Sequence, residues 1–177
     1  MANERPLEKI GDICDVKGRI GWRGYTVSDL SDHGPLVIGA TQITDDQKLD
    51  LSKPVYLSQE KYLESPEIMI EKDDIIVVKV GNTIGKVAIV NYDIGEATIN
   101  PNTVLLKRIK CNPYYLYYFL ISPFGQALLK NNSSASAQPA INQETIKNFL
   151  IPLPTRNIQN AIADVLFGAV NPSGKLS

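Results

Sequence analysis

The chain has 177 residues, of which 44% are hydrophobic and 21% charged, with a formal net charge of −1. This size suits one well-packed domain, and no apolar run approaches the roughly 20 residues that a membrane-spanning helix needs. The N-terminus lacks a signal peptide's apolar segment, and the distant Cys14 and Cys111 suit neither a disulfide framework nor a zinc site. These features predict a cytoplasmic protein with free thiols.

The charge is unevenly distributed along the chain. Residues 1–106 hold 11 Lys and Arg against 17 Asp and Glu, a net −6, whereas residues 107–177 hold 7 against 2, a net +5. A chain of this kind can present a basic face to nucleic acid although its overall charge is near zero. Scattered, solvated charges explain the composition equally well.

Strands are expected in the first two thirds of the chain, where apolar and alternating runs are short and are separated by turn residues. The expected strands and extended runs are 7–17, 35–43, 49–58, 73–80, 86–92 and 103–109. A Gly-rich polar stretch at 18–34 predicts a long loop, and one or two helical turns are expected after Ser58, ending at Pro66.

Two of these strands flank the segment "VKVGNTIGKVAI" at 78–89. A phosphate-binding loop requires four residues between its glycines and a Ser or Thr after the lysine. Here three residues separate Gly81 from Gly85, Val87 follows Lys86, and the next run is β-branched instead of helical. The segment therefore predicts a β-hairpin and not a nucleotide site.

Helices are expected after residue 112. Asn112 and Ser122 each precede a proline, a pairing typical of a helix N-cap and its first residue. A polar loop at 131–140, a short helix at 142–149 and an extended exit at 150–154 follow. A final helix is expected over 155–167, and the glycines and proline of 168–177 predict a flexible tail. The fold class is therefore α+β, mostly β with a twisted or barrel-like sheet and with several helices in the second half.

No catalytic or metal-binding constellation is apparent. His33, the single histidine, lies in a turn sequence, and the acid pairs 45–46 and 73–74 adjoin turns or strand starts, where neighbouring residues point to opposite faces. "NPYY" at 112–115 has one proline too few for the loop of adenine methyltransferases. The sequence predicts no metal site, no cofactor and no enzymatic activity of its own.

Several stretches, taken in order, resemble one family: the specificity (S) subunits of type I restriction–modification systems. The matching stretches are "LEKIGDICDVKGRIGWRGY", "GPLVIGATQI", "DDIIVVKVGNTIGKVAIV", "INPNTVLLK", "YYLYYFLISPFGQ", "SAQPAINQETIKNFLIPLP" and "NIQNAIADVL". No single stretch is specific, but their order over residues 7–166 is.

The resemblance implies a non-catalytic target-recognition domain that reads half of a split duplex-DNA site. A methyltransferase subunit would supply S-adenosylmethionine and dock on long spacer helices, and restriction subunits would join through it. Here the recognition domain is expected over residues 1–154 and the spacer helix is reduced to residues 155–167, about three turns. This single-domain length resembles a half-subunit or a fragment. One helical face is expected to contact other subunits, including a possible second copy: Ile158, Ala161, Ile162, Val165 and Leu166.

DNA contacts are expected from loops that carry cations, amides, hydroxyls and aromatic rings. The candidate residues are Lys17, Arg19, Trp22, Arg23, Tyr25, Thr41, Gln42, Lys79, Asn82, Thr83, Lys86, Lys130, Asn131, Ser134 and Gln138. Structural roles could explain some of these residues equally well: Trp22 and Tyr25 would fill the core, Gln42 would be a polar residue at the end of a strand, and residues 131–138 would be a flexible connector between helices. The tyrosines of 114–118 have helical spacing and predict core packing.

Two hypotheses remain open from sequence. The first is a DNA recognition module that directs a separate adenine methyltransferase and nuclease. The alternative is a truncated S-subunit remnant that binds proteins without reading DNA itself.

Overall fold

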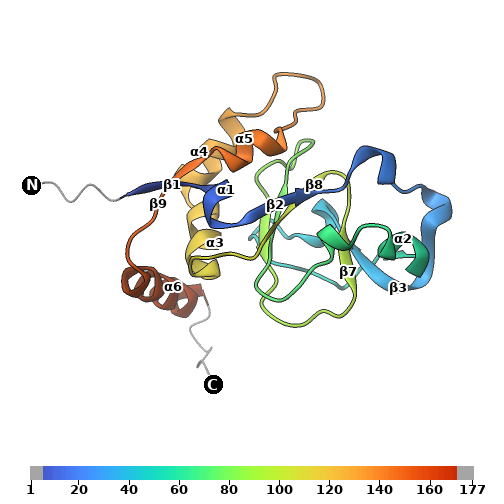
Figure 1. Ribbon diagram of the computed structural model, residues 1–177, viewed down its shortest axis with the longest axis horizontal. Coiled ribbons are helices and arrows are strands. Elements are labelled where there is room, and N and C mark those ends of the chain that lie inside the picture. Colours follow the sequence, from blue (N-terminus) through green and yellow to red (C-terminus); the bar gives the residue numbers. More distant parts are fainter. Residues whose placement is uncertain (1–5, 171–177) are drawn as a thin grey trace, which may run out of the picture.

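The computed structural model describes residues 6–170, which form one body of three sheets and several helices (Figure 1). The strands are β1 (Leu7–Lys9), β2 (Asp15–Gly18), β3 (Leu30–Ile38), β4 (Tyr56–Leu57), β5 (Ile75–Val78), β6 (Val87–Ile89), β7 (Ala97–Ile99), β8 (Thr103–Lys107) and β9 (Leu150–Pro152). The α-helices are α1 (Ile10–Ile13), α2 (Gln59–Leu63), α3 (Pro113–Ile121), α4 (Pro123–Asn131), α5 (Gln143–Lys147) and α6 (Arg156–Val170). Single 3₁₀ turns lie at Gly21–Arg23, Val27–Asp29, Ala40–Gln42 and Pro66–Ile68.

The central sheet is antiparallel, with strand order β2-β8-β5-β6, and is covered on both faces. Alternate residues of β5 enter different cores: Ile75 and Val77 join the helical layer, whereas Ile76 and Val78 join the second sheet. The continuous apolar runs in β5 and β8 follow from this double burial, because each face of these strands needs apolar side chains.

The second sheet has the order β4-β3-β7, in which β3 pairs antiparallel with β4 and parallel with β7. In Figure 1 this sheet and α2 occupy the half of the molecule opposite the two termini. β3 begins at Leu30, so the loop predicted over 18–34 is too long. The β3–β4 pairing shifts register between Ser31 and Leu36, and this irregular stretch obscures the strand pattern in the sequence.

Helices α3, α4 and α6 lie on the side of the termini, next to the short β1–β9 ribbon (Figure 1). Both predicted helix starts are confirmed. The Asn112 side chain accepts hydrogen bonds from the Tyr114 and Tyr115 amides, and the Ser122 hydroxyl accepts one from the Gly125 amide. Such caps satisfy amides that the helix leaves unpaired, at about 1 kcal/mol each.

The final helix differs from its prediction, because α6 continues through Gly168 to Val170. A glycine in a helix costs only about 1 kcal/mol relative to alanine. Helix α6 is also tied to the body, since Gln159 accepts the Asn112 amide through Oε1 at 2.9 Å and Phe167 packs edge-on against Tyr114. Residues 171–177 of the predicted tail lie outside the described residues.

The predicted α+β class is confirmed, with packed open sheets and no closed barrel over residues 6–170. The predicted hairpin at 78–89 is confirmed by the β5–β6 pairing. Within the same residues, no helix is long and apolar enough to cross a membrane.

One ionic cluster fastens the start of β5 to the end of β8. The Lys107 Nζ donates to the Asp74 carboxylate at 2.7 Å, to the Met69 carbonyl at 2.5 Å and to Glu71 at 3.3 Å. The Asp74 side chain is 6% exposed, and its burial raises the pKa of its carboxyl although Lys107 opposes the shift. Removing either charge leaves the other poorly compensated in the interior.

We expect Lys107→Met to lower the free energy of unfolding by about 3–5 kcal/mol at pH 7, because it leaves the Asp74 carboxylate buried without its ammonium partner. Loss of the ammonium raises the pKa of Asp74 further. The deficit should therefore be smallest below the unfolded-state pKa of about 3.9, where the carboxyl is protonated in both states, and should grow as the pH rises. Urea titrations at pH 3 and pH 7 measure both effects.

The exposed Lys72, two residues before Asp74, provides the control. Lys72→Met should stay within about 0.5 kcal/mol of the wild type at both pH values. Equal losses for the two variants would contradict the role of the ionic cluster.

Candidate nucleic-acid interface

Loops from both sheets meet at one end of the central sheet. The register pairs Gly18 with Val104 and Val78 with Thr103, so β2 and β5 end where β8 begins. Strands β3 and β7 end side by side, and only residues 100–102 separate β7 from β8. The segments 19–29, 39–42, 79–86 and 100–102 therefore leave the sheets at the same end.

The hairpin loop, residues 79–86, is held against the polar loop, residues 131–140. Gly81 donates its amide to the Pro139 carbonyl at 2.8 Å, and Ile141 donates to Lys79 at 2.8 Å. The Gln126 side chain of α4 donates to the Gly85 carbonyl at 2.8 Å. This arrangement brings Lys79, Asn82 and Thr83 to the same surface as the polar loop.

The polar loop is ordered by its own hydroxyl groups. The Ser134 hydroxyl accepts the Ala140 amide at 3.1 Å, and the Ser136 hydroxyl donates to the Gln138 carbonyl at 2.7 Å. Ser134 and Gln138 remain exposed, whereas Asn131 lines an apolar groove with Phe124 and Leu150. The loop therefore presents a defined polar surface, and Asn131 lies apart from it.

Three lysines at this end have no carboxylate partner within residues 6–170: Lys17, Lys79 and Lys130. Lys79 is half-buried, and desolvation lowers the pKa of its ammonium. Binding of an anion would stabilise the Lys79 ammonium, because the anion would supply the counter-charge that the surrounding protein does not. Lys86 differs, because its Nζ lies 2.9 Å from Asp45 and donates to the Ile43 carbonyl at 3.0 Å.

One of the candidate base-reading residues, Gln42, points into the protein. Gln42 is 4% exposed; its amide donates to the Lys53 carbonyl at 3.2 Å and accepts the Gly39 amide at 3.0 Å. Thr41 is exposed but donates its hydroxyl to Gln42 at 3.0 Å. The side-chain amide of Gln42 already has protein partners on both its oxygen and its nitrogen. Gln42 thus holds the shape of the segment that carries Thr41 and has no free amide group for a base.

The segment after β2 is also tied inward. Arg19 is buried beneath the half-buried ring of Tyr25, and Arg23 donates to the Glu64 carbonyl at 2.8 Å. The side chain of Trp22 lies outside the described part of the structure. Thr26, Val27 and Ser28 form the exposed outer side of this segment.

The sequence did not identify the tip between β7 and β8 as part of this surface. Asn102 is exposed, and its amide is held by the Asn100 side chain at 3.0 Å. Lys79 donates its backbone amide to the Asn102 carbonyl at 2.9 Å, which joins the tip to the hairpin loop. The sequence "NPN" at 100–102 indicates a turn. Its place on this surface, however, depends on the parallel pairing of β7 with β3, which the sequence does not reveal.

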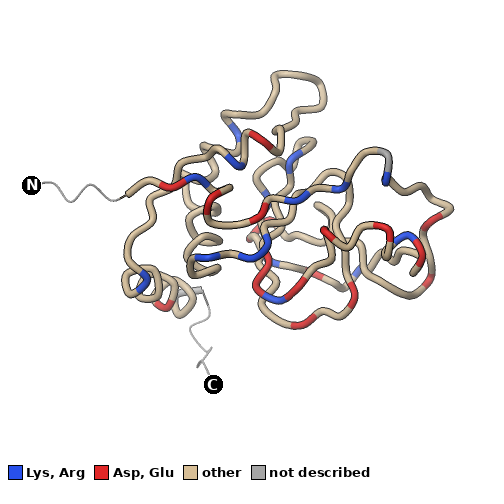
Figure 2. Tube along the Cα trace, in the orientation of Figure 1, with Lys and Arg blue, Asp and Glu red and all other residues tan. Residues whose placement is uncertain are grey.

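Acidic residues gather elsewhere. They are frequent in the half of the molecule built around β3 and α2, as Figure 2 shows. The opposite end of the central sheet carries Asp15, which pairs with Arg108, together with Asp73 and Asp74. Asp74 is paired with Lys107, and Asp45 beside the hairpin loop is paired with Lys86. The three lysines without a carboxylate partner in the described residues are therefore what favour a polyanion at the loop end.

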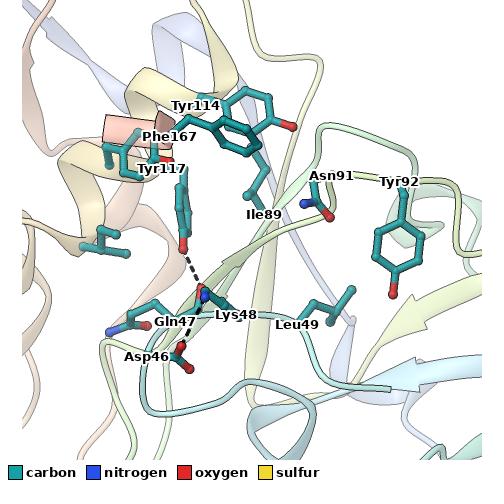
Figure 3. A pocket seen from close by; sticks show the side chains of 12 residues that line it. Asp46, Gln47, Lys48, Leu49, Ile89, Asn91, Tyr92, Tyr114, Tyr117 and Phe167 are labelled. Carbon is teal, nitrogen blue, oxygen red and sulfur yellow. Dashed lines mark hydrogen bonds and ion pairs between the residues drawn. The ribbon is translucent and has the colours of Figure 1, made fainter. Parts of the chain in front are cut away.

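A separate cleft of about 280 Å³ runs beside the edge strand β6 (Figure 3). Tyr114 and Tyr117 of α3, Phe167 of α6 and the 46–49 segment line it. Tyr117 donates its hydroxyl to the Gln47 carbonyl at 2.6 Å. The predicted core packing is confirmed for Tyr115, Tyr117 and Tyr118, which are buried.

The outer face of α6 is apolar and accessible. Ile158 is 48% and Val165 70% exposed, Leu166 and Ala161 are also exposed, and Ile162 is half-buried. Gln159 and Ala163 form the buried side. The residues predicted for subunit contact therefore lie on the side of α6 that faces away from the body.

Comparison with known proteins gives a consistent family. The model of the type I restriction modification DNA specificity domain matches residues 8–171. The type I restriction enzyme EcoBI specificity subunit of Escherichia coli is 31% identical over 124 residues, which cover 67% of this chain and 25% of that protein.

Solved structures share the fold. The HsdS subunit from Thermoanaerobacter tengcongensis superposes with a TM-score of 0.66 at 19% identity, covering 92% of this chain and 36% of that one. The S subunit of a type I restriction-modification system from M. genitalium gives 0.60 at 16% identity, covering 94% and 40%. The chain thus spans well under half the length of these relatives.

The hairpin glycines provide a test of this surface. Both have positive φ, 93° at Gly81 and 96° at Gly85, so alanine at either should cost about 1–2 kcal/mol. A Cβ at Gly81 meets open space, whereas one at Gly85 would lie 2.9 Å from Gln126 Oε1 and 3.2 Å from Lys130. Gly85→Ala should therefore lower the urea midpoint more than Gly81→Ala, and equal midpoints would contradict the packing of α4 on the hairpin.

Proposed function

Because the chain belongs to the type I restriction modification DNA specificity domain family, we propose that it is a sequence-specific DNA recognition module. It reads one half of a bipartite duplex target and directs a separate adenine methyltransferase and, through it, a nuclease subunit. The chain supplies no catalytic group, and S-adenosylmethionine is held by the methyltransferase subunit.

The observation that carries this proposal is the set of unpaired lysines at the loop end of the central sheet. Lys17, Lys79 and Lys130 are free to meet phosphates, whereas Lys86 and Arg23 are engaged with the protein. Phosphate contacts supply most of the affinity and fix the register, and base edges are read by groups on the same surface. Thr41, Asn82, Thr83, Asn102, Ser134 and Gln138 are the exposed polar residues there.

We expect the protein to enrich one short motif from a random duplex library at low salt. Binding should be weak for a lone domain, and about three phosphate contacts give a slope of roughly −2.7 for log K against log salt. Lys79→Gln should make this slope about 0.9 less steep, because one phosphate contact is lost. Fluorescence anisotropy at several salt concentrations measures both.

Lys72→Gln is the matched control, because it removes an exposed lysine near the opposite end of the sheet. Its slope should equal that of the wild type. The absence of any enriched motif, with and without a methyltransferase subunit, would sink the proposal.

We propose further that α6 docks on another subunit through its exposed apolar face. Ile158, Val165 and Leu166 follow helical spacing along the outer side, which favours packing against another helix. The methyltransferase subunit is the expected partner, and a second copy of this chain is the alternative.

Val165→Asp should abolish association with a type I methyltransferase subunit, measured by light scattering of the mixture. The change buries a charge in the interface but leaves the isolated fold intact, because Val165 is 70% exposed. Asn157→Asp adds the same charge roughly a quarter turn around the helix and should preserve the complex. If Val165→Asp leaves the mixture unchanged, α6 is not the docking element.

A further inference from the structure

Arg19 is buried, although arginine side chains are usually exposed. It is 7% exposed at the start of the recognition loop, residues 19–29, and its guanidinium points toward β7. The Nε donates to the Ile99 carbonyl at 3.1 Å, and Nη2 donates to the Thr98 hydroxyl at 3.0 Å. These two acceptors belong to a fully buried strand.

The same guanidinium also holds the loop itself. Its Nη1 donates to the Arg23 carbonyl at 3.3 Å, and its carbon lies 5.2 Å from the centre of the Tyr25 ring. One rigid, planar group therefore bridges β7 and two points of the recognition loop. A lysine lacks the fork geometry needed for these simultaneous bonds.

The loop beyond this bridge is ordered by local bonds. Arg23 donates its amide to the Ile20 carbonyl at 2.8 Å, and Thr26 donates its amide to Asp29 at 2.7 Å. Its outer side exposes Thr26, Ser28 and Val27, the last at 84%. The local bonds shape two turns, and Arg19, together with the bond from the Arg23 side chain to the Glu64 carbonyl, fixes where the first turn sits on the sheet.

Outward rotation of Arg19 toward a ligand is costly. It would strip the Ile99 carbonyl and the Thr98 hydroxyl of a donor in the interior, and an unsatisfied buried polar group costs about 1–3 kcal/mol. The contact with Tyr25 would be lost as well. The inward position is therefore the favoured one, and a ligand would have to offset this cost to turn Arg19 outward.

We propose that Arg19 is a positioning residue that sets sequence discrimination without touching DNA, by holding the recognition loop against β7. This inference rests on the proposed function and deepens it. The outer residues of the loop then approach the duplex from a fixed geometry, so that less entropy is lost on binding. A phosphate contact and a positioning role make different predictions for salt dependence, because only a phosphate contact contributes to the slope of log K against log salt.

Thr98→Val tests the bridge from the side that DNA does not reach, because Thr98 is 0% exposed. It keeps the shape of the side chain but removes one acceptor of Arg19 together with the hydroxyl that donates to the Ile68 carbonyl at 3.3 Å. We expect amide hydrogen exchange in residues 20–25 to become about three- to tenfold faster without DNA, as one lost hydrogen bond implies. Discrimination between the enriched motif and a scrambled duplex should fall, while the salt slope stays at the wild-type value.

Arg19→Gln should show both effects more strongly, again with an unchanged slope. If this variant fails to fold, Arg19→Lys keeps the charge and tests the fork alone. A slope that becomes about 0.9 less steep in Arg19→Gln, as expected for Lys79→Gln, would mean that Arg19 contacts a phosphate and would overturn the proposal.

Ile76→Val is the control for stability, because it trims a buried side chain of the same core at a cost of about 0.5–1.5 kcal/mol. It should leave loop exchange and discrimination unchanged. If Thr98→Val behaves like this control, Arg19 does not position the loop. If the wild type binds no duplex, the proposed function fails. The hydrogen-exchange rates of residues 20–25 in Thr98→Val and Ile76→Val then decide by themselves whether Arg19 holds the loop.

Discussion

The central pair of strands, β5 and β8, is buried on both faces, and the rest of the structure depends on this constraint. Alternate residues of each strand serve different cores, with Ile75, Val77, Val104 and Leu106 on the helical side and Ile76, Val78 and Leu105 on the other. A shift of one residue in either strand would exchange these sets. The register is therefore strongly fixed, and with it the end of the sheet at which each loop emerges.

This register explains why distant polar segments share one surface. The hairpin loop follows β5, the 100–102 tip precedes β8, and the polar loop of residues 131–140 is hydrogen-bonded to the hairpin loop. Apart from Ile84 of the hairpin loop, which is buried in the helical-side core, these segments place no side chain in the two large cores, so their exposed residues are free to differ without loss of the fold. A rigid sheet that presents polar loops at one end suits the recognition role proposed above.

The sequence predicted the elements whose signals are local. Strands β5, β6 and β8 follow from apolar runs, and α3 and α4 follow from Asn112 and Ser122 before proline. The burial of Arg19 was not predictable, because it depends on acceptors far along the chain, whereas Gln42 is turned inward by local bonds to Gly39 and Lys53, 3 and 11 residues away. The acceptors of Arg19, Thr98 and Ile99, lie 79 and 80 residues away. Residue type alone favours exposure for both side chains.

The candidate site divides its polar residues by task. Arg19 and Gln42 spend their hydrogen-bonding groups on the protein, and Lys86 is paired with Asp45. Lys17, Lys79 and Lys130 keep their charges unpaired within the described residues. A buried polar side chain needs protein partners, whereas a phosphate contact needs an unpaired cation. One side chain therefore does not hold the loop and bind a phosphate at the same time. In the proposed function, loop geometry and attraction to the DNA backbone would thus be carried by different side chains, so discrimination and affinity could change independently.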